Sequence, residues 1–120
     1  MNTKLKQKIT NALRKIWNES ELKNNFRKSV RFQVDVGEYK NNTKKYLFYF
    51  KCNLCGFQAA CKDKKHHTDH ITPVLDVKSG FQGFDVYIER LLLCDESNFQ
   101  MLCKSCHKEK TNLERKCRKS

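Results

Sequence analysis

The sequence is poor in apolar residues and contains no long apolar run. Hydrophobic residues make up 38% of its 120 positions, so a single domain of this size has a thin core and needs a disulfide, a metal or a partner. The longest apolar run is residues 46–50, whereas a membrane-spanning helix needs about 20 residues. No apolar stretch follows the basic N-terminus, as it would in a secretory signal. We therefore expect a soluble, cytoplasmic protein that does not contact membranes.

Acidic residues are scarce relative to basic ones. The chain has 25 Lys and Arg against 13 Asp and Glu, a formal net charge of +12. Residues 1–51 carry 13 basic and four acidic side chains, residues 52–102 carry five and seven, and residues 103–120 carry seven and two. Two basic flanks around a mildly acidic middle favour a polyanionic partner such as nucleic acid. The alternative is that a small lysine-rich protein is basic for solubility.

Seven cysteines without a secretion signal indicate thiolate or metal chemistry, not a closed disulfide framework. Two residues separate Cys52 from Cys55, and two separate Cys103 from Cys106; each pair matches half of a tetrahedral four-cysteine zinc site. Gly56 suits the turn after the first pair, because glycine tolerates a positive φ. Such a zinc is structural, since four thiolates leave no open position. A redox pair or unrelated buried cysteines are the alternatives. Three cysteines have no partner at ligand spacing: Cys61, Cys94 and Cys117.

The hydrophobic periodicity predicts an α+β fold with an N-terminal helical segment followed by a β-hairpin. Apolar residues recur at three- and four-residue steps from Leu5 to Trp17, which is typical of an amphipathic helix. Ser20 is suited to cap a second helix, after which the period changes to two, as in a half-buried strand. The later elements expected are strands at 32–36 and 46–50, a loop at 37–45, and helices at 85–93 and 105–116.

Two stretches of the second half concentrate titratable and metal-binding side chains. Residues 66–74 are HHTDHITPV, and residues 98–111 are NFQMLCKSCHKEKT. Together with the cysteine pairs, these strings make residues 50–115 resemble the HNH endonucleases, in particular the small zinc-containing members common in bacteriophages. The Asp-His-Ile-x-Pro-Val and Asn-x-Gln-x-Leu-Cys-x-x-Cys-His patterns occur in the family's order. Residues 1–49 lie outside the resemblance.

The resemblance implies a ββα-metal core, which is a β-hairpin followed by a helix around one divalent cation, with a structural zinc beside it. His70 would be the general base, and Asn98 would orient His70 and fix its tautomer. Asp69 and His107 would hold the catalytic cation, Mg²⁺ or Mn²⁺, with Co²⁺ or Ni²⁺ as substitutes. The zinc ligands would be Cys52, Cys55, Cys103 and Cys106. The implied activity is hydrolysis of phosphodiester bonds in duplex DNA, and a phage-encoded member would act in the host cytoplasm.

The residue types suit this chemistry independently of the resemblance. A neutral histidine, with an ordinary pKa of about 6.5, accepts a proton at pH 7. A cation held by one carboxylate and one imidazole keeps positions open for phosphate. Adjacent residues of a strand face opposite sides, so the strand is expected to end or twist at Asp69 and His70. His66 or His67 is an alternative metal ligand to Asp69.

Simpler roles are open to the same residues. An Asp-His pair commonly lies on the surface, Asn98 can cap a turn, and His107 can be a surface histidine or an alternative zinc ligand. The alternative function is a non-catalytic, zinc-dependent nucleic-acid-binding module in which these residues only stabilise the fold. A protein-interaction zinc module with a basic helical arm is a third possibility.

The expected organisation has three segments. Residues 1–49 form basic helices and a hairpin packed on the core, residues 50–116 form the nuclease core, and residues 117–120 are a basic tail. Lys110, one turn after His107, is the predicted phosphate clamp. The N-terminal helix would widen the DNA footprint through Lys4, Lys8, Arg14 and Lys15. DNA is expected to contact the basic residues around the last helix: Lys104, Lys108, Lys110, Arg115, Lys116, Arg118 and Lys119.

Overall fold

The computed structural model describes residues 2–119, without the side chains of residues 118 and 119. The described residues form the predicted mixed α+β fold, with four α-helices and two small antiparallel sheets. The first sheet has the strand order β1-β2-β3, and the second pairs β4 with β5. In chain order the elements are α1 (Thr3–Asn18), α2 (Glu21–Val30), β1 (Phe32–Glu38), β2 (Lys44–Lys51), β3 (Gln58–Ala60), β4 (His66–His70), α3 (Phe84–Leu92), β5 (Phe99–Cys103) and α4 (Lys104–Lys119).

Side-chain caps fix where the first two helices begin. The Asn2 side chain accepts hydrogen bonds from the backbone N–H groups of Lys4 and Leu5, at 2.8 and 3.4 Å. The predicted cap at Ser20 is confirmed, because its Oγ accepts from Lys23 N at 3.2 Å. Each cap satisfies backbone donors that have no partner inside the helix, so α1 and α2 are separate helices joined at Ser20.

The structure has one strand that the sequence does not predict, and several elements differ from the prediction at their ends, most of all the last helix. The short strand β3 was not expected, and it pairs with the end of β2 from Tyr49 to Lys51. The last helix continues to Lys119, through most of the segment 117–120 that the sequence predicts as a tail. Ser120 and the side chains of Arg118 and Lys119 lie outside the described residues.

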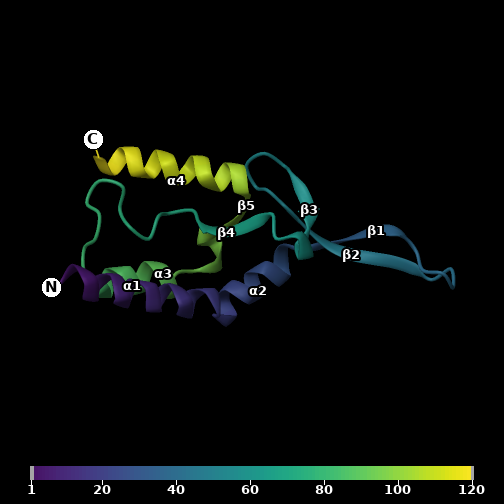
Figure 1. The fold of residues 1–120 in the computed structure, drawn as a ribbon, viewed down its shortest axis with the longest axis horizontal. Helices are drawn as coiled ribbons and strands as arrows, with labels where there is room; N and C mark the ends of the chain where they lie inside the picture. The colour runs from purple at the N-terminus through teal and green to yellow at the C-terminus, as the bar shows by residue number, and fades with distance from the viewer. Residues whose placement is uncertain (1, 120) are drawn as a thin grey trace.

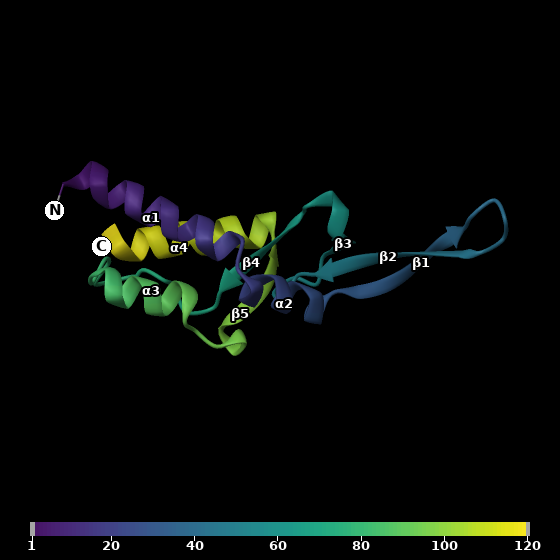
Figure 2. The same ribbon diagram turned by 90° about the horizontal axis from the view of Figure 1, so that it is seen from below.

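The β4–β5 pair lies in the middle of the helical half of the molecule (Figure 1). Helix α4 runs along one side of it, and α1 and α3 lie together on the other. Seen from below, the β1–β2 hairpin extends away from the helices (Figure 2). Because neighbouring side chains of β4 alternate between its two faces, this strand contributes residues both to the core and to the face covered by α4.

One hydrophobic cluster joins the N-terminal helices to the second half of the chain. Trp17 of α1 has its ring centroid 4.9 Å from that of Phe99, and Phe26 of α2 lies 5.5 Å from the same ring. Helices α1 and α2 therefore pack on the core. The buried members of the cluster are Trp17, Phe26, Phe50, Tyr87, Leu91, Phe99 and Met101.

No helix within residues 2–119 combines the length and the apolar character that crossing a membrane requires.

Candidate functional site

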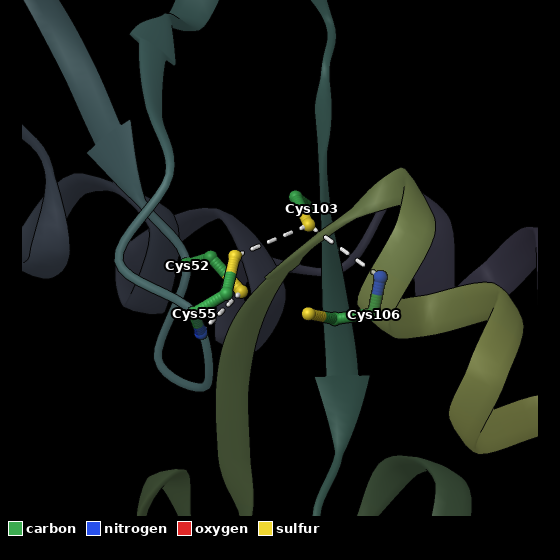
Figure 3. A group of neighbouring side chains, drawn as sticks. All are labelled: Cys52, Cys55, Cys103 and Cys106. Carbon is green, nitrogen blue, oxygen red and sulfur yellow. Dashed lines mark hydrogen bonds between the residues drawn. The ribbon is translucent and has the colours of Figure 1, made fainter.

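Four cysteines from two distant parts of the chain meet at one end of the β4–β5 pair (Figure 3). Cys52 and Cys55 follow β2, whereas Cys103 ends β5 and Cys106 lies in the first turn of α4. Their sulfur atoms all lie within 4.8 Å of one another, and the Sγ atoms of Cys55 and Cys103 are 3.7 Å apart. The structure thus brings together all four cysteines that the sequence predicts as zinc ligands.

Two turns of the same kind present the sulfurs. The backbone N–H of Cys55 points at the Cys52 sulfur at 3.5 Å, and that of Cys106 points at the Cys103 sulfur at 3.4 Å. Gly56, with φ of 81°, closes the first turn by donating to the carbonyl of Cys52 at 3.0 Å. The two-residue spacing produces this geometry, because it lets a tight turn direct both sulfurs and their amide donors to one point.

The cluster fits a zinc ion in distance and in charge. A tetrahedral ion with Zn–S bonds of about 2.3 Å separates its sulfurs by about 3.8 Å, close to the 3.7 Å between Cys55 and Cys103. Burial raises the pKa of Cys52, but amides of Cys103, Cys55 and Leu54 outweigh it and lower the pKa to about 6. The neighbouring Cys103 thiol, followed by burial, raises the pKa of Cys106. One thiolate therefore forms readily, while a full set needs a cation such as Zn²⁺.

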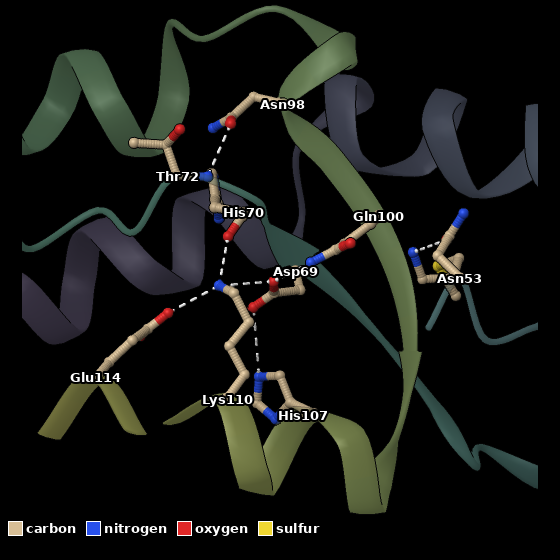
Figure 4. Close-up of polar contacts among 10 residues, drawn as sticks. Asn53, Asp69, His70, Thr72, Asn98, Gln100, His107, Lys110 and Glu114 are labelled. Atoms are coloured by element: carbon tan, nitrogen blue, oxygen red, sulfur yellow. Dashed lines mark hydrogen bonds and ion pairs between the residues drawn. The ribbon is translucent and has the colours of Figure 1, made fainter. Parts of the chain in front are cut away.

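Asp69 and His107 lie together on the face of β4 that α4 covers (Figure 4). Nε2 of His107 is 3.9 Å from Oδ1 of Asp69, a separation that one cation can bridge, because each ligand–metal distance is about 2.0–2.2 Å. The other oxygen of Asp69 accepts from the Gln100 amide at 3.0 Å, directly across the β4–β5 pair. The predicted pair thus supplies one carboxylate and one imidazole from facing elements, a donor set that suits a divalent cation.

His70 lies on the opposite face of β4, against the core. Its side chain is buried beneath Trp17, with ring centroids 4.6 Å apart. The Nε2 atom is 3.1 Å from the carbonyl oxygen of Leu91, which can only accept a hydrogen bond, so Nε2 carries the proton and Nδ1 keeps the lone pair. Burial, against weaker effects of Leu91 and Asp69, lowers the pKa of His70. The ring is thus held neutral, in one tautomer, at pH 7.

Asn98 does not fix this tautomer, contrary to the expectation from the sequence. Its side-chain oxygen accepts from the backbone N–H of Thr72 at 2.9 Å, and its backbone carbonyl accepts from Ile71 N at 2.7 Å. These two bonds tie the chain leaving β4 to the start of β5. The ring contact belongs to Leu91, whose carbonyl is freed because α3 ends at Leu92. Asn98 therefore acts on the backbone that follows His70.

Lys110 is bound to the site itself. Its ammonium group lies 2.9 Å from Oδ2 of Asp69, 2.8 Å from Oε1 of Glu114 and 2.8 Å from the carbonyl oxygen of His70. Burial tends to lower the pKa of Lys110, but Glu114 and Asp69 outweigh it and raise the pKa. The sequence predicts a lysine that clamps phosphate, whereas here two carboxylates already pair with it. Glu114 was not predicted at the site.

A cleft of about 360 Å³ opens between α1, the end of β4 and α4. Both Asp69 and His70 line it although they are adjacent in β4, because the strand ends at His70, as expected. Arg14 of α1 forms part of the wall and donates from Nε to the Tyr87 hydroxyl at 3.2 Å. Arg14 lies three residues before the buried Trp17, so its position on this face could be inferred from the helical period. The main lining residues are Arg14, Trp17, Asp69, His70, His107 and Lys110.

The two preceding histidines differ in their surroundings. His66 is buried, with Nε2 2.9 Å from the carbonyl oxygen of Phe57 and its ring stacked on Phe57, so it belongs to the core. His67 is exposed and stacks on His107 with ring centroids 4.9 Å apart. Burial, followed by His107, lowers the pKa of His67. Of the two alternatives to Asp69, His67 is the one that lies beside His107.

Three further basic residues of α4 form a separate stripe. Steps of four and seven residues place Lys104, Lys108 and Arg115 on one side of the helix, away from the face that carries Lys110 and Glu114. All three are exposed. They are available to phosphate groups, whereas Lys110 is engaged.

Comparisons of the chain with protein-family models, curated protein sequences and solved structures find no match. The function is therefore inferred from the sequence and the site.

Proposed function

We propose that this protein is a metal-dependent DNA endonuclease of the HNH type, with a ββα-metal core formed by β4, β5 and α4. The observation that carries the proposal is that Asp69, His70 and His107 meet at one cleft, with the proton-accepting nitrogen of His70 selected by the Leu91 carbonyl. The order of the sequence motifs and the net charge of +12 support the same function.

Asp69 and His107 would hold the catalytic cation, and Cys52, Cys55, Cys103 and Cys106 would hold the structural zinc. Mg²⁺ or Mn²⁺ suits the carboxylate, while the imidazole also admits Co²⁺ or Ni²⁺. When bound, such a cation supplies Lewis-acid stabilisation of the charge that develops on the phosphate.

His70 and Arg14 would have different roles in the hydrolysis. Nδ1 of His70 takes a proton from the attacking water while the water oxygen bonds to phosphorus. The bond from phosphorus to the leaving oxygen then breaks, and the leaving oxygen takes a proton from solvent. Arg14, on the opposite wall of the cleft, adds a positive charge near the phosphate. Because burial lowers the pKa of His70, the base is present in its active, neutral form at pH 7.

The test is supercoiled-plasmid cleavage with added Mg²⁺, Mn²⁺ or Ni²⁺, comparing the wild type with His70→Ala at matched zinc content. A general base contributes about 10²–10⁴-fold to the rate, so His70→Ala should lose about 1,000-fold in nicking rate. Zinc content and duplex-DNA affinity should stay within about twofold of the wild type. Partial rescue by free imidazole would show that the missing ring, not misfolding, causes the loss.

Cleavage at the wild-type rate by His70→Ala would refute the assignment of the base. Salt-sensitive DNA binding without cleavage by either protein would instead favour the non-catalytic binding module. One observation supports that second function. Lys110 already forms an ion pair with Asp69, and such a pair can stabilise the fold without any catalytic role. Wild-type cleavage that depends on the added metal separates the two functions.

A further inference from the structure

The β1–β2 hairpin is the largest feature that the proposed active site does not use. We call residues 32–51 the arm. It projects from the helical half along the longest axis of the molecule (Figures 1 and 2), which measures 62 Å against 28 and 25 Å for the others. Strand β3 supports β2 only between Tyr49 and Lys51, so most of the arm is an isolated two-stranded ribbon.

Large apolar side chains cover the arm without being buried by the rest of the chain. Tyr39, Tyr46 and Phe48 are 54%, 50% and 37% exposed, and burial in the core begins only at Phe50. A two-stranded ribbon by itself is only marginally stable in water. A ribbon that keeps exposed aromatic residues along its length is therefore suited to a partner that covers it.

The charge of the arm identifies the kind of partner. Its tip and β2 carry Lys40, Lys44 and Lys45, against Asp35 and Glu38 on β1. Among the described residues, Lys44 lies 3.9 Å from the Asp35 carboxylate, and Lys40 and Lys45 form no ion pair. Basic residues also lie at the base of the arm, where a cavity of about 310 Å³ is lined by Arg27 and Lys28 of α2 and by Arg31, which follows α2. Cations also lie on the aromatic rings: Arg31 is 3.8 Å from the centroid of Phe48. A polyanion with flat, apolar groups complements this surface.

The dimensions of the arm match a groove of duplex DNA. The major groove accepts a two-stranded β-ribbon, and a strand of seven or eight residues spans about 25 Å at about 3.4 Å per residue. That length covers about seven base pairs at about 3.4 Å per step along one strand. The bulge between Asp35 and Gly37 increases the twist of the ribbon, so that it can follow the curvature of the groove.

We propose that the arm binds a groove of duplex DNA beyond the active-site cleft and covers about seven base pairs of it, with Lys40, Lys44 and Lys45 on the phosphates. The proposal takes its partner from the proposed function, since the same duplex would pass the cleft. It gives the N-terminal part of the chain a role in extending the footprint and setting the position of the cut.

The test compares two variants of equal net charge. The arm variant is Lys40→Gln/Lys44→Gln/Lys45→Gln. The control variant, Lys62→Gln/Lys64→Gln/Lys78→Gln, changes three exposed lysines outside the arm, α2 and α4. Zinc-loaded full chains are titrated with a labelled duplex of about 24 base pairs over a range of salt concentrations, without added Mg²⁺, and their mass in solution is measured alongside.

Each phosphate contact contributes about 0.9 to the slope of log affinity against log salt. The arm variant should therefore lose about 2–3 from this slope and bind at least about 10-fold more weakly near physiological salt, while the control keeps the wild-type slope. Shortening the duplex to about 10 base pairs should weaken the wild type and leave the arm variant nearly unchanged.

Equal slopes for the two variants would overturn the proposal. A second outcome would also overturn it: the wild type is a dimer, the arm variant is a monomer, and the two bind DNA with the same affinity. The arm would then be a self-association surface. The endonuclease proposal is judged separately by plasmid cleavage. If the wild type cuts no DNA and the arm variant loses salt dependence, the arm proposal is supported and the endonuclease proposal is refuted. If the wild type cuts DNA and the arm and control variants have equal salt slopes, the endonuclease proposal is supported and the arm proposal is refuted.

Discussion

Asp69 is the residue at which the charges of the site meet. One oxygen accepts from Lys110 and Gln100, and the other faces His107. The side chain of Asp69 is only 13% exposed, so its negative charge needs a positive group nearby. The ammonium group of Lys110 supplies that charge. Lys110 in turn is shared with Glu114. Under the proposed function, the main task of Lys110 is to position Asp69, and phosphate contacts fall to the exposed stripe on α4.

Asn98→Ala should reduce cleavage by less than His70→Ala does. The substitution removes the 2.9 Å bond to Thr72 N, which holds the backbone just after His70 but does not touch its ring. Loss of such a supporting bond lowers activity by about 10- to 100-fold and stability by about 1 kcal/mol. Plasmid nicking rates and urea unfolding measure the two effects.

Asn98→Asp is the matched control, because a carboxylate keeps an acceptor oxygen for Thr72 N. It should retain most of the nicking rate. If Asn98→Ala cuts DNA as fast as the wild type, or if both variants are equally impaired, this bond does not support the catalytic geometry.

The side chains of the site could be predicted from sequence better than the contacts that organise them. Asp69, His107 and the four cysteines carry distinctive chemistry at distinctive spacing, and the structure brings each set together. The carbonyl of Leu91 could not be predicted, since every residue has one and only the fold decides which lies beside His70. The sequence also could not show whether Lys110, one turn after His107, is exposed or is paired with Glu114.

Helix α1 is the element that connects the N-terminal extension to the chemistry. Trp17 packs on both His70 and Phe99, and Arg14 forms part of the cleft wall. The helix therefore closes the core over His70, the proposed general base, and contributes to the burial that lowers the pKa of His70. An extension that looks separate in sequence is part of the site.

Trp17→Ala should destabilise the fold by about 3–5 kcal/mol, the usual cost of removing a large buried aromatic side chain. Its neighbour Ile16 is 54% exposed against 6% for Trp17, so Ile16→Ala should change stability by less than about 0.5 kcal/mol. Urea unfolding followed by circular dichroism compares them, with Trp17→Phe as a milder variant if Trp17→Ala does not fold. Similar midpoints for Ile16→Ala and both Trp17 variants would mean that α1 does not pack as described.

The helices were easier to predict than their packing or the third strand. Periodic apolar residues and the Ser20 cap are local signals, and they placed α1 and α2 correctly. Strand β3 is only three residues long and depends on pairing with β2, so no local pattern reveals it. The direction in which the hairpin projects is likewise set by contacts at its base.

The four-cysteine cluster joins the two parts of the whole molecule. Cys52 and Cys55 stand at the base of the arm, and Cys103 and Cys106 stand where β5 passes into α4. Asn53 also supports this junction, because its side-chain Oδ1 accepts from Met101 N at 2.7 Å and its backbone N–H donates to Met101 O at 2.8 Å. With a thin core, the molecule would depend on a metal held by these cysteines to keep the arm joined to the helical half.

Cys52→Ser should therefore lose the zinc and much of the stability together. Metal binding at such a site contributes directly to folding, and we expect a fall in Tm of about 10 °C or more. Cys117→Ser is the control, since Cys117 is exposed and lies outside the cluster. It should keep one zinc per chain by elemental analysis and the wild-type Tm. Amide exchange should also accelerate in β5 and the first turn of α4 of Cys52→Ser. Equal zinc content and equal Tm in the two variants would show that these sulfurs do not hold the metal and that another interaction joins the arm to the core.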